Sequence, residues 1–363
     1  MEIRIHTLTP LWTGGVDGTM DRIHETGIIG SLRWWYEAIV RGLGGRACDP
    51  TEHTCNFDAE RYRKSRAADE RRRLREAGLC DVCQLFGATG WQRRFRMEVI
   101  DETQWIWDQH DRMLNIRPPQ RARGWFLMSG KMGKLTLRLE GNHRALSLLA
   151  AMFLFLEGWG SVGAKPQLGY GVFRIENRDE VSAWAKSWKW RISEEENASR
   201  AKDTLRRKDI PDLQRLGFFR YSFQPSKPGW WTQVPGIPPV AIQVQFLVSR
   251  FRVVPLVPSL KNEWRFNRWR RAWGDERRIF GTLHPTRRRG RVAVSWAYKA
   301  EGNKWEIRGW VWLPTRLQTA ERLWEVLSDY ETWRQVVGVA GDLKTQRFRE
   351  KQGVLQLLQG CVS

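Results

Sequence analysis

The chain has 363 residues, and its 61 Lys and Arg against 40 Asp and Glu give a formal net charge of +21. Apolar residues make up 41% of the sequence and include 22 Trp, which excludes a disordered chain and supplies enough material for about two packed domains. The surplus of positive charge favours a polyanionic partner, either a nucleic acid or an anionic membrane surface.

The chain shows no export or membrane signal. The longest apolar run, residues 145–156, is too short to span a bilayer. The N-terminus has no charged region followed by an apolar one, so we expect no signal peptide and a cytoplasmic protein that does not bind membranes. Five cysteines, an odd number, argue against a disulfide framework.

The first half of the chain predicts a ferredoxin-like domain. Alternating apolar and polar residues predict strands at 1–14, 95–100, 134–141 and 172–178. Leu32, Trp35 and Ile39 recur at helical spacing, and Ser31 could cap that helix. Residues 142–159 are apolar nearly all round, which predicts a buried helix capped by Asn142. The resulting order, β-α-β-β-α-β, is the ferredoxin-like pattern.

The second half repeats this order more loosely. Strands are predicted at 218–225, 241–254 and 353–358, a hairpin at 291–314, and helices at 259–273 and 318–338. Phe86-Gly87 and Phe280-Gly281 are each followed by an arginine pair and a strand, which suggests a duplicated domain.

We therefore expect an α+β protein made of two tandem ferredoxin-like (RRM-like) domains. The first domain would span residues 1–178, with a small Cys-rich insertion around 46–83. Residues 179–215 would be a linker or an exposed helix, and 216–363 a second, divergent ferredoxin-like domain.

The insertion carries the sequence's metal-site candidate: Cys48, Cys55, Cys80 and Cys83. Four thiolates can close a tetrahedral zinc site, and a Cys-x-x-Cys pair places two sulfurs on one turn. A structural zinc would hold the base of an insertion that has no core of its own. His53 could replace one cysteine, four free buried thiols are the alternative, and Cys361 is predicted to be unrelated.

Two further features bear on nucleic-acid binding. Residues 158–171 hold five glycines and Lys165, and could let backbone N–H groups approach a phosphate or simply form a tight turn. Arginines also alternate with tryptophans, which suits phosphate pairing and base stacking. The residues concerned are Arg33, Trp34, Trp91, Arg93, Arg94, Arg96, Arg287, Arg288 and Arg289.

A nuclease centre is the weaker hypothesis. Asp17, Asp21 and His24 share one loop, and a His or Asp there could act as a general acid or base. Neither a cluster of carboxylates at two-metal spacing nor a second histidine accompanies them in the sequence. A flexible polar loop is the preferred interpretation, and we assign no catalytic residue.

Four motifs resemble those of the RAMP superfamily: TPLWTGG (9–15), IIGSLRWWYEAIVRGLGG (28–45), CDVCQLFGATGWQRRFRMEV (80–99) and WGSVGAKPQLGYGVF (159–173). Within it, they look most like the first subunits of the type III-B CRISPR effector, the Cmr complex. The resemblance implies two ferredoxin-like domains and RNA contacts on Arg33, Trp34 and Arg41, on Arg93, Arg94 and Arg96, and on Lys165. The glycine-rich loop has one basic residue here, whereas many RAMP loops have several.

The resemblance implies a non-catalytic RNA-binding subunit of an antiviral, RNA-guided complex, holding crRNA (the guide) or target RNA near the guide 3′ end beside other RAMP subunits. We expect the positive charge to form a continuous track over both halves. Two alternatives remain open: a RAMP endoribonuclease that processes guide precursors, and a subunit that mainly binds other proteins.

Overall fold

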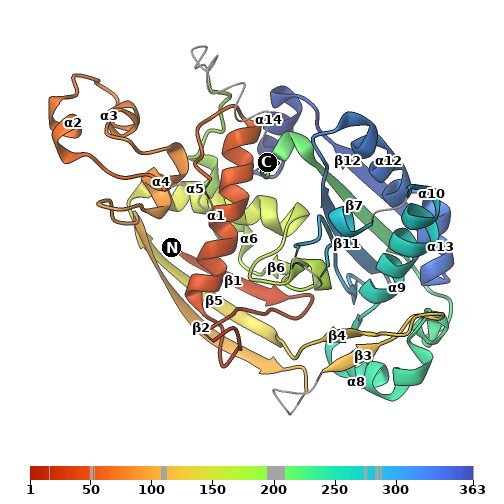
Figure 1. The fold of residues 1–363 in the computed structure, drawn as a ribbon. Coiled ribbons are helices and arrows are strands. Elements are labelled where there is room, and N and C mark those ends of the chain that lie inside the picture. The colour runs from red at the N-terminus through yellow and green to blue at the C-terminus, as the bar shows by residue number, and fades with distance from the viewer. Residues whose placement is uncertain are drawn as a thin grey trace.

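The computed structural model describes residues 1–15, 17–49, 52, 54–107, 113–193, 209–273, 276–282, 286 and 288–362. It contains two main antiparallel sheets, one in each half of the chain, each with helices packed on it, and a separate two-stranded sheet (Figure 1). The expected α+β class is therefore confirmed. No helix in these ranges is long and apolar enough to cross a membrane.

The first sheet has the ferredoxin-like topology that the sequence predicts. Its strands run in the order β2-β5-β1-β6, and every neighbouring pair is antiparallel. The elements of this unit are β1 (Glu2–Thr7), α1 (Glu25–Gly42), β2 (Phe95–Trp105), β5 (Lys131–Gly141), α5 (His143–Trp159) and β6 (Phe173–Ile175). A short hairpin, β3 (Leu114–Ile116) with β4 (Trp125–Leu127), interrupts it.

The two helices of this unit differ from the sequence prediction in one respect. Asn142 caps α5 as expected, since its side chain accepts a hydrogen bond from the Ala145 amide at 2.9 Å. In contrast, α1 begins a turn and a half before the predicted cap. Ser31 lies inside α1, where its hydroxyl donates to the Ile28 carbonyl and accepts from the Gly163 amide.

The Cys-rich insertion extends away from the first sheet (upper left in Figure 1). It contains the short helices α2 (Ala59–Lys64), α3 (Glu70–Glu76) and α4 (Asp81–Phe86). Aspartates at the N-caps of α2 and α3 accept backbone hydrogen bonds, which explains why helices this short begin where they do. No side chain of α2 is buried and only Leu74 of α3 is, so the insertion has almost no core.

The second sheet repeats the topology, with an extra edge strand. Its order is β12-β7-β11-β10-β8, and β9 also pairs with β11. The strands are β7 (Leu216–Phe223), β8 (Val253–Val254), β9 (Val292–Val294), β10 (Ala297–Lys299), β11 (Trp305–Trp312) and β12 (Gly341–Arg347). The main helices are α8 (Ala241–Phe251), α9 (Val257–Asn262), η5 (Glu263–Arg270), α10 (Arg271–Trp273), α11 (Arg277–Phe280), α12 (Leu317–Ser328), α13 (Tyr330–Val337) and α14 (Lys351–Gly360).

Three predictions for this half were wrong. Residues 241–251 form helix α8 instead of a strand, with Val244 and Leu247 buried three residues apart. The predicted helix at 318–338 is split at Asp329, which leaves the helical region and caps α13. The predicted last strand, 353–358, is part of helix α14, and β12 closes the sheet instead.

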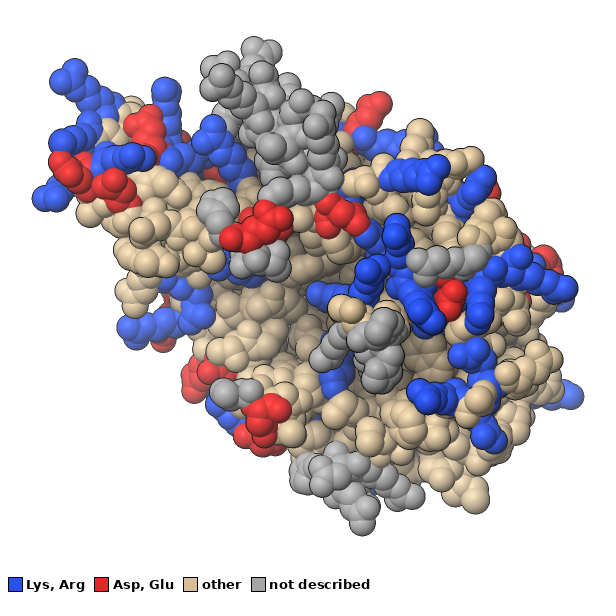
Figure 2. Space-filling model, viewed as in Figure 1, with Lys and Arg blue, Asp and Glu red and all other residues tan. Residues whose placement is uncertain are grey.

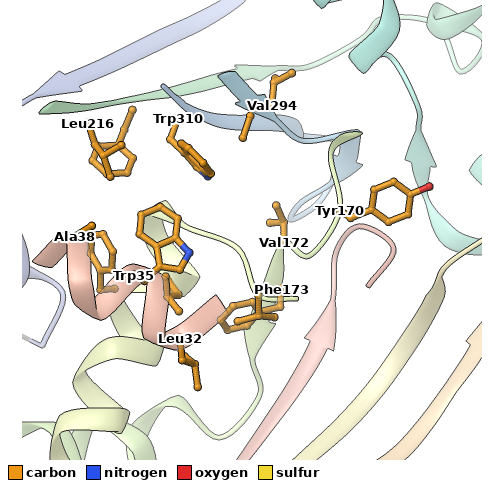
Figure 3. Packing of buried hydrophobic residues seen from close by; sticks show 14 of the residues in the cluster. Leu32, Trp35, Ala38, Tyr170, Val172, Phe173, Leu216, Val294 and Trp310 are labelled. Carbon is orange, nitrogen blue, oxygen red and sulfur yellow. The ribbon is translucent and has the colours of Figure 1, made fainter. Parts of the chain in front are cut away.

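The two halves pack against each other through α1, α5 and the second sheet. Trp35 of α1 and Trp310 of β11 face each other, with ring centroids 5.4 Å apart (Figure 3). The C-terminal carbonyls of α5 accept hydrogen bonds from the second sheet: Arg220 donates to Gly158 at 2.8 Å, and Arg308 donates to Glu157. These cations complement the negative end of the helix dipole.

The stretch between the two sheets begins with a packed helix. Helix α6 (Arg178–Lys186) lies against α5 and buries Val181 and Ala185. Short 3-10 turns complete the connections: η1 (Pro166–Leu168), η2 (Leu213–Arg215), η3 (Trp230–Gln233) and η4 (Pro238–Val240). Residues 194–208 of the predicted linker lie outside the described residues.

Candidate metal site and nucleic-acid interface

The four cysteines of the insertion meet at its base. Cys48, Cys55, Cys80 and Cys83 are all buried, and their sulfurs lie within 4.8 Å of one another. The Cys48 and Cys83 sulfurs are 3.6 Å apart. Tetrahedral zinc with Zn–S bonds of about 2.3 Å requires sulfurs roughly 3.8 Å apart, so the donor set and its spacing fit a structural Zn²⁺.

The pKa values of Cys48, Cys55 and Cys80 are lowered to about 7, whereas hydrogen bonds with these three thiols raise the pKa of Cys83. Hydrogen bonds with Cys48 and Cys83 lower the pKa of the Cys55 thiol to about 7, against an opposing contribution from Cys80. The Cys80 amide also donates to the Cys55 sulfur at 3.3 Å. Cys361 lies outside the cluster, and His53 lies outside the described residues.

Arg33, predicted to contact RNA, points at the cysteine cluster. Its guanidinium donates to the Cys83 sulfur at 3.3 Å, to the Cys48 sulfur at 3.9 Å and to the Gly87 carbonyl at 3.4 Å. Glu37, one turn along α1, accepts from it at 3.2 Å. A cation beside four thiolates would reduce the charge repulsion that a Zn(Cys)₄ centre carries.

Arg41, the other candidate on this helix, is also used inside the protein. It is 9% exposed and donates to the carbonyls of Cys48 at 2.7 Å and Pro211 at 2.9 Å. It therefore ties α1 both to the cysteine insertion and to the chain entering the second sheet.

The Phe-Gly motif ends a short helix in the same way in both halves. Gly87 ends α4 with φ +87°, and Gly281 ends α11 with φ +81°. These positive φ values are accessible to glycine without strain. Each turn is closed by a bridge, and the chain then returns to the residue before the phenylalanine: Arg94 donates its amide to Leu85 at 2.9 Å, and Arg291 donates to Ile279 at 2.8 Å. The internal repeat is thus a structural one.

The basic residues after the first turn lie at the surface in varying degrees. Arg94 and Arg96 are exposed, whereas Arg93 is half-buried and donates to the Phe95 carbonyl. Trp91 is half-buried, with the Arg94 guanidinium 4.0 Å from its ring centroid.

The candidates of the second turn lie next to α1. Arg288 and Arg289 are exposed, and Arg287 lies outside the described residues. The Arg289 guanidinium is 5.8 Å from the ring of Trp34, which is half-buried and packs on Trp310 at 5.2 Å.

The glycine-rich loop is largely occupied by the second half of the chain. The Leu168 carbonyl accepts from the Trp296 indole at 2.9 Å, and the Gln167 carbonyl accepts from Lys261. A Cβ at Gly169 would lie 2.5 Å from the Trp296 ring. Lys165 lies over Trp12, with its Nζ 3.6 Å from the ring centroid.

The loop proposed as a nuclease centre contains one close pair. His24 Nε2 lies 2.5 Å from an Asp21 carboxylate oxygen, and the His24 amide donates to Thr13 Oγ1. Asp17 instead accepts from Thr19. Within the described residues, the four cysteines are the one group of three or more metal-ligating side chains close enough to share an ion.

Comparison with known proteins identifies the first half. Residues 4–174 match the family model of the RAMP superfamily, and this segment holds the first sheet, the insertion and the glycine-rich loop. Over residues 4–174 this chain is similar to the RAMP superfamily, and we call this segment the RAMP domain. The recognition made from four sequence motifs is thereby supported by an independent comparison.

Two other comparisons complete this result. Among solved structures, the chain is similar to Cmr1 from Pyrococcus furiosus in its apo form, at 14% identity and a TM-score of 0.43. That match covers 96% of this chain and 98% of Cmr1. No curated protein sequence matches the chain.

The positive charge is unevenly spread over the RAMP domain and the second domain (Figure 2). On the face shown, Lys and Arg gather over the second domain, while much of the surface between it and the insertion is neutral. Exposed arginines of the second domain include Arg270, Arg271, Arg277, Arg278, Arg288 and Arg289. On this face the charge forms separate groups, so the expected continuous track is not seen there.

Proposed function

We propose that this chain is a non-catalytic, RNA-binding subunit of a type III-B CRISPR (Cmr) complex, an antiviral assembly that targets RNA with a guide RNA. It would hold guide or target RNA near the guide 3′ end and contact other RAMP subunits. The observation that carries the proposal is the RAMP family match over residues 4–174. The net charge of +21 and the second ferredoxin-like sheet are consistent with it.

In this proposal the two Phe-Gly turns present the phosphate ligands. Arg93, Arg94 and Arg96 follow the first turn, and Arg288 and Arg289 belong to the second. Guanidinium groups bind phosphates bidentately, and base pairing between guide and target would supply sequence specificity.

Five other residues that were predicted to contact RNA contribute less to RNA binding in this proposal. Arg33 and Arg41 act mainly in holding the insertion, because their guanidinium groups already contact cysteine sulfurs and carbonyls. The other three are Trp34, Trp91 and Lys165. Each packs on a neighbouring side chain, so a base or phosphate could contact it from one side at most.

Fluorescence anisotropy with a labelled single-stranded RNA, measured at several salt concentrations, tests the proposal. The full chain should bind with a steep salt dependence, since phosphate neutralisation releases counterions. Replacing Arg93 and Arg94 with alanine should weaken binding and flatten the log–log salt slope by about 0.7 for each lost contact. The pair Arg288→Ala and Arg289→Ala should act similarly. Binding that does not depend on salt would contradict the proposal.

A charge-matched control separates these effects from the loss of net charge. Lys304 and Arg316 are exposed residues of the second domain that take no part in either turn. The Lys304→Ala, Arg316→Ala variant should bind almost as the unmodified chain does.

The close His24–Asp21 pair names the residues on which the endoribonuclease alternative can be tested. An aspartate that orients an imidazole is a common arrangement in acid–base catalysis. Incubation with guide-precursor RNA should yield no cleavage; cleavage that His24→Ala abolishes would replace our proposal with the enzyme.

An exposed apolar hollow favours the scaffold alternative as a second role. It lies between the β3–β4 hairpin and α8, and Met113, Ile242 and Phe246 are exposed there. Crosslinking in the assembled complex distinguishes the two: RNA crosslinks at the Phe-Gly turns support RNA binding, whereas protein crosslinks alone support a scaffold.

We also propose that the cysteine cluster holds one structural zinc ion. Four protein sulfurs would fill its coordination sphere and leave no open position for a substrate. The ion would stabilise an insertion that buries very few of its own side chains.

A further inference from the structure

Two adjoining hollows form one groove on the helical side of the RAMP domain. Their volumes are about 120 and 510 Å³, and both are lined by Tyr36, Arg71, Arg144 and Trp188. The smaller hollow reaches Arg94 beside the first Phe-Gly turn. The larger one reaches residues 187–191, just after α6.

The groove carries positive charge that the described residues leave unpaired. Arg71 pairs with Asp81 at 3.1 Å, and Arg94 pairs with Glu70 at 3.3 Å. By contrast, Arg144, Lys189 and Arg191 are exposed, and no ion pair joins them to a carboxylate in the described part of the chain. Asp69 is the one remaining acidic residue among the described lining residues.

Asp81 does not cancel this charge. Burial raises the pKa of its carboxyl, but hydrogen bonds from Arg75 and Arg71 outweigh that effect and hold the pKa below the ordinary value. The resulting carboxylate is fully engaged by those two arginines, at 2.7 and 3.1 Å. Arg144, Lys189 and Arg191 therefore remain the unpaired charges of the groove among the described residues.

The larger hollow is also lined by two tryptophans whose N–H groups have no hydrogen-bond partner. Trp188 and Trp190 pack edge to face at 5.7 Å, and the indole N–H of each is buried without a partner. Trp190 is 6% exposed, and a buried indole N–H is normally hydrogen-bonded. Helix α5 begins at the same place, and the positive end of its dipole adds to the attraction for anions.

We infer that this groove binds a single RNA strand, with Arg144, Lys189 and Arg191 as phosphate ligands and the Trp188 ring against a base. The inference rests on the proposed function and names a path for the strand, from Arg94 along the start of α5 to residues 188–191. Cations next to the half-buried Trp188 ring suit a nucleic acid better than an acidic peptide, which would use the charges and leave the ring without a partner.

The test compares paired variants of the full chain in the anisotropy titration. Replacing Arg144 and Arg191 with alanine should weaken binding about tenfold or more and flatten the salt slope by about 1.4, twice the value for one single-strand contact. Replacing the same two residues with lysine should preserve most of the slope, because the charge remains. The Lys304→Ala, Arg316→Ala control should leave both quantities almost unchanged.

A second measurement locates the strand directly. An oligonucleotide substituted with 4-thiouridine should crosslink on irradiation to the peptide that contains Trp188 and Lys189. Loss of Arg144 and Arg191 should reduce that crosslink more strongly than crosslinks elsewhere.

The outcomes distinguish this inference from the proposed function. If the alanine pair leaves affinity and slope unchanged while the Arg93, Arg94 pair reduces both, the groove is not on the RNA path, although the chain still binds RNA. If the unmodified chain shows no salt-dependent binding, both the proposed function and this inference are contradicted. If an acidic peptide occupies the groove and no RNA crosslink maps there, the occupant is a protein and the inference is overturned.

Discussion

The rings of Trp34 in α1 and Trp310 in β11 lie 5.2 Å apart, so the first helix of the RAMP domain packs directly on the central part of the second sheet. Trp35 contacts the same indole from its edge at 5.4 Å. Trp310 is 7% exposed. The two domains therefore share a continuous aromatic core (Figure 3).

Trp310→Ala should destabilise the whole chain by about 3–5 kcal/mol, because it leaves a cavity between two domains that stabilise each other. Urea unfolding followed by circular dichroism measures this loss. Trp273→Ala, at a tryptophan that is 38% exposed, is the control and should cost much less. Equal effects of the two substitutions would show that the shared core contributes little.

The protein as purified should contain one zinc ion per chain, measurable by elemental analysis. Cys80→Ser or Cys83→Ser should abolish retention of the metal and lower the melting temperature, since metal binding energy contributes to folding. Cys361→Ser should retain the full metal content, because this thiol lies outside the cluster. Full metal content in the Cys83→Ser variant would exclude the four-sulfur site.

Lys261 should make stability depend on pH. It is 2% exposed, and burial, together with the charge of Arg265, lowers the pKa of its amine from 10.5 to about 7. Between about pH 7 and 10 the unfolded chain therefore binds more protons than the folded one, so stability should rise with pH, by at most about 1.4 kcal/mol per unit.

Lys261→Met isolates this contribution from the cysteines that titrate in the same range. Denaturant unfolding at pH 6.5 to 9.5 should show a smaller rise in stability for the variant than for the unmodified chain. Parallel curves for the two proteins would mean that Lys261 keeps its ordinary pKa.

Two glycines of the segment 158–171 should respond oppositely to alanine. Gly169 has φ +91°, and a Cβ there would lie 2.5 Å from the Trp296 ring and 2.9 Å from its amide nitrogen. Gly169→Ala should therefore destabilise the chain by more than about 2 kcal/mol. At Gly158, inside the helix, no atom lies within 4 Å of the new Cβ, and alanine should be neutral or stabilise by up to about 1 kcal/mol. Thermal unfolding of both variants measures the difference.

Some features of this protein follow from local sequence alone. Three predictions were correct because each depends on periodicity or spacing within a short segment. They are the ferredoxin-like order of strands and helices in the first half, the buried helix α5 with its Asn142 cap, and the grouping of the four cysteines. The RAMP motifs belong to the same class, since each is a contiguous run of residues.

The second domain shows where local pattern fails. Residues 241–251 are rich in Val, Ile and Phe, which suit a strand, but they form α8 because their burial follows helical spacing against the neighbouring elements. Val354, Leu357 and Leu358 likewise become one face of α14. In both segments, packing against the neighbouring elements decided between helix and strand.

The roles of the basic residues were decided by tertiary structure. Composition determines that the chain carries +21 charges, yet it cannot say which arginines meet a sulfur, a carbonyl or solvent. Arg33 and Arg41 lie on α1 beside the cysteine insertion, so their charge is used internally, whereas Arg144 and Arg191 come from distant segments to line one groove. The charge of a side chain follows from its residue type, but the packing of the whole chain decides which group that side chain contacts.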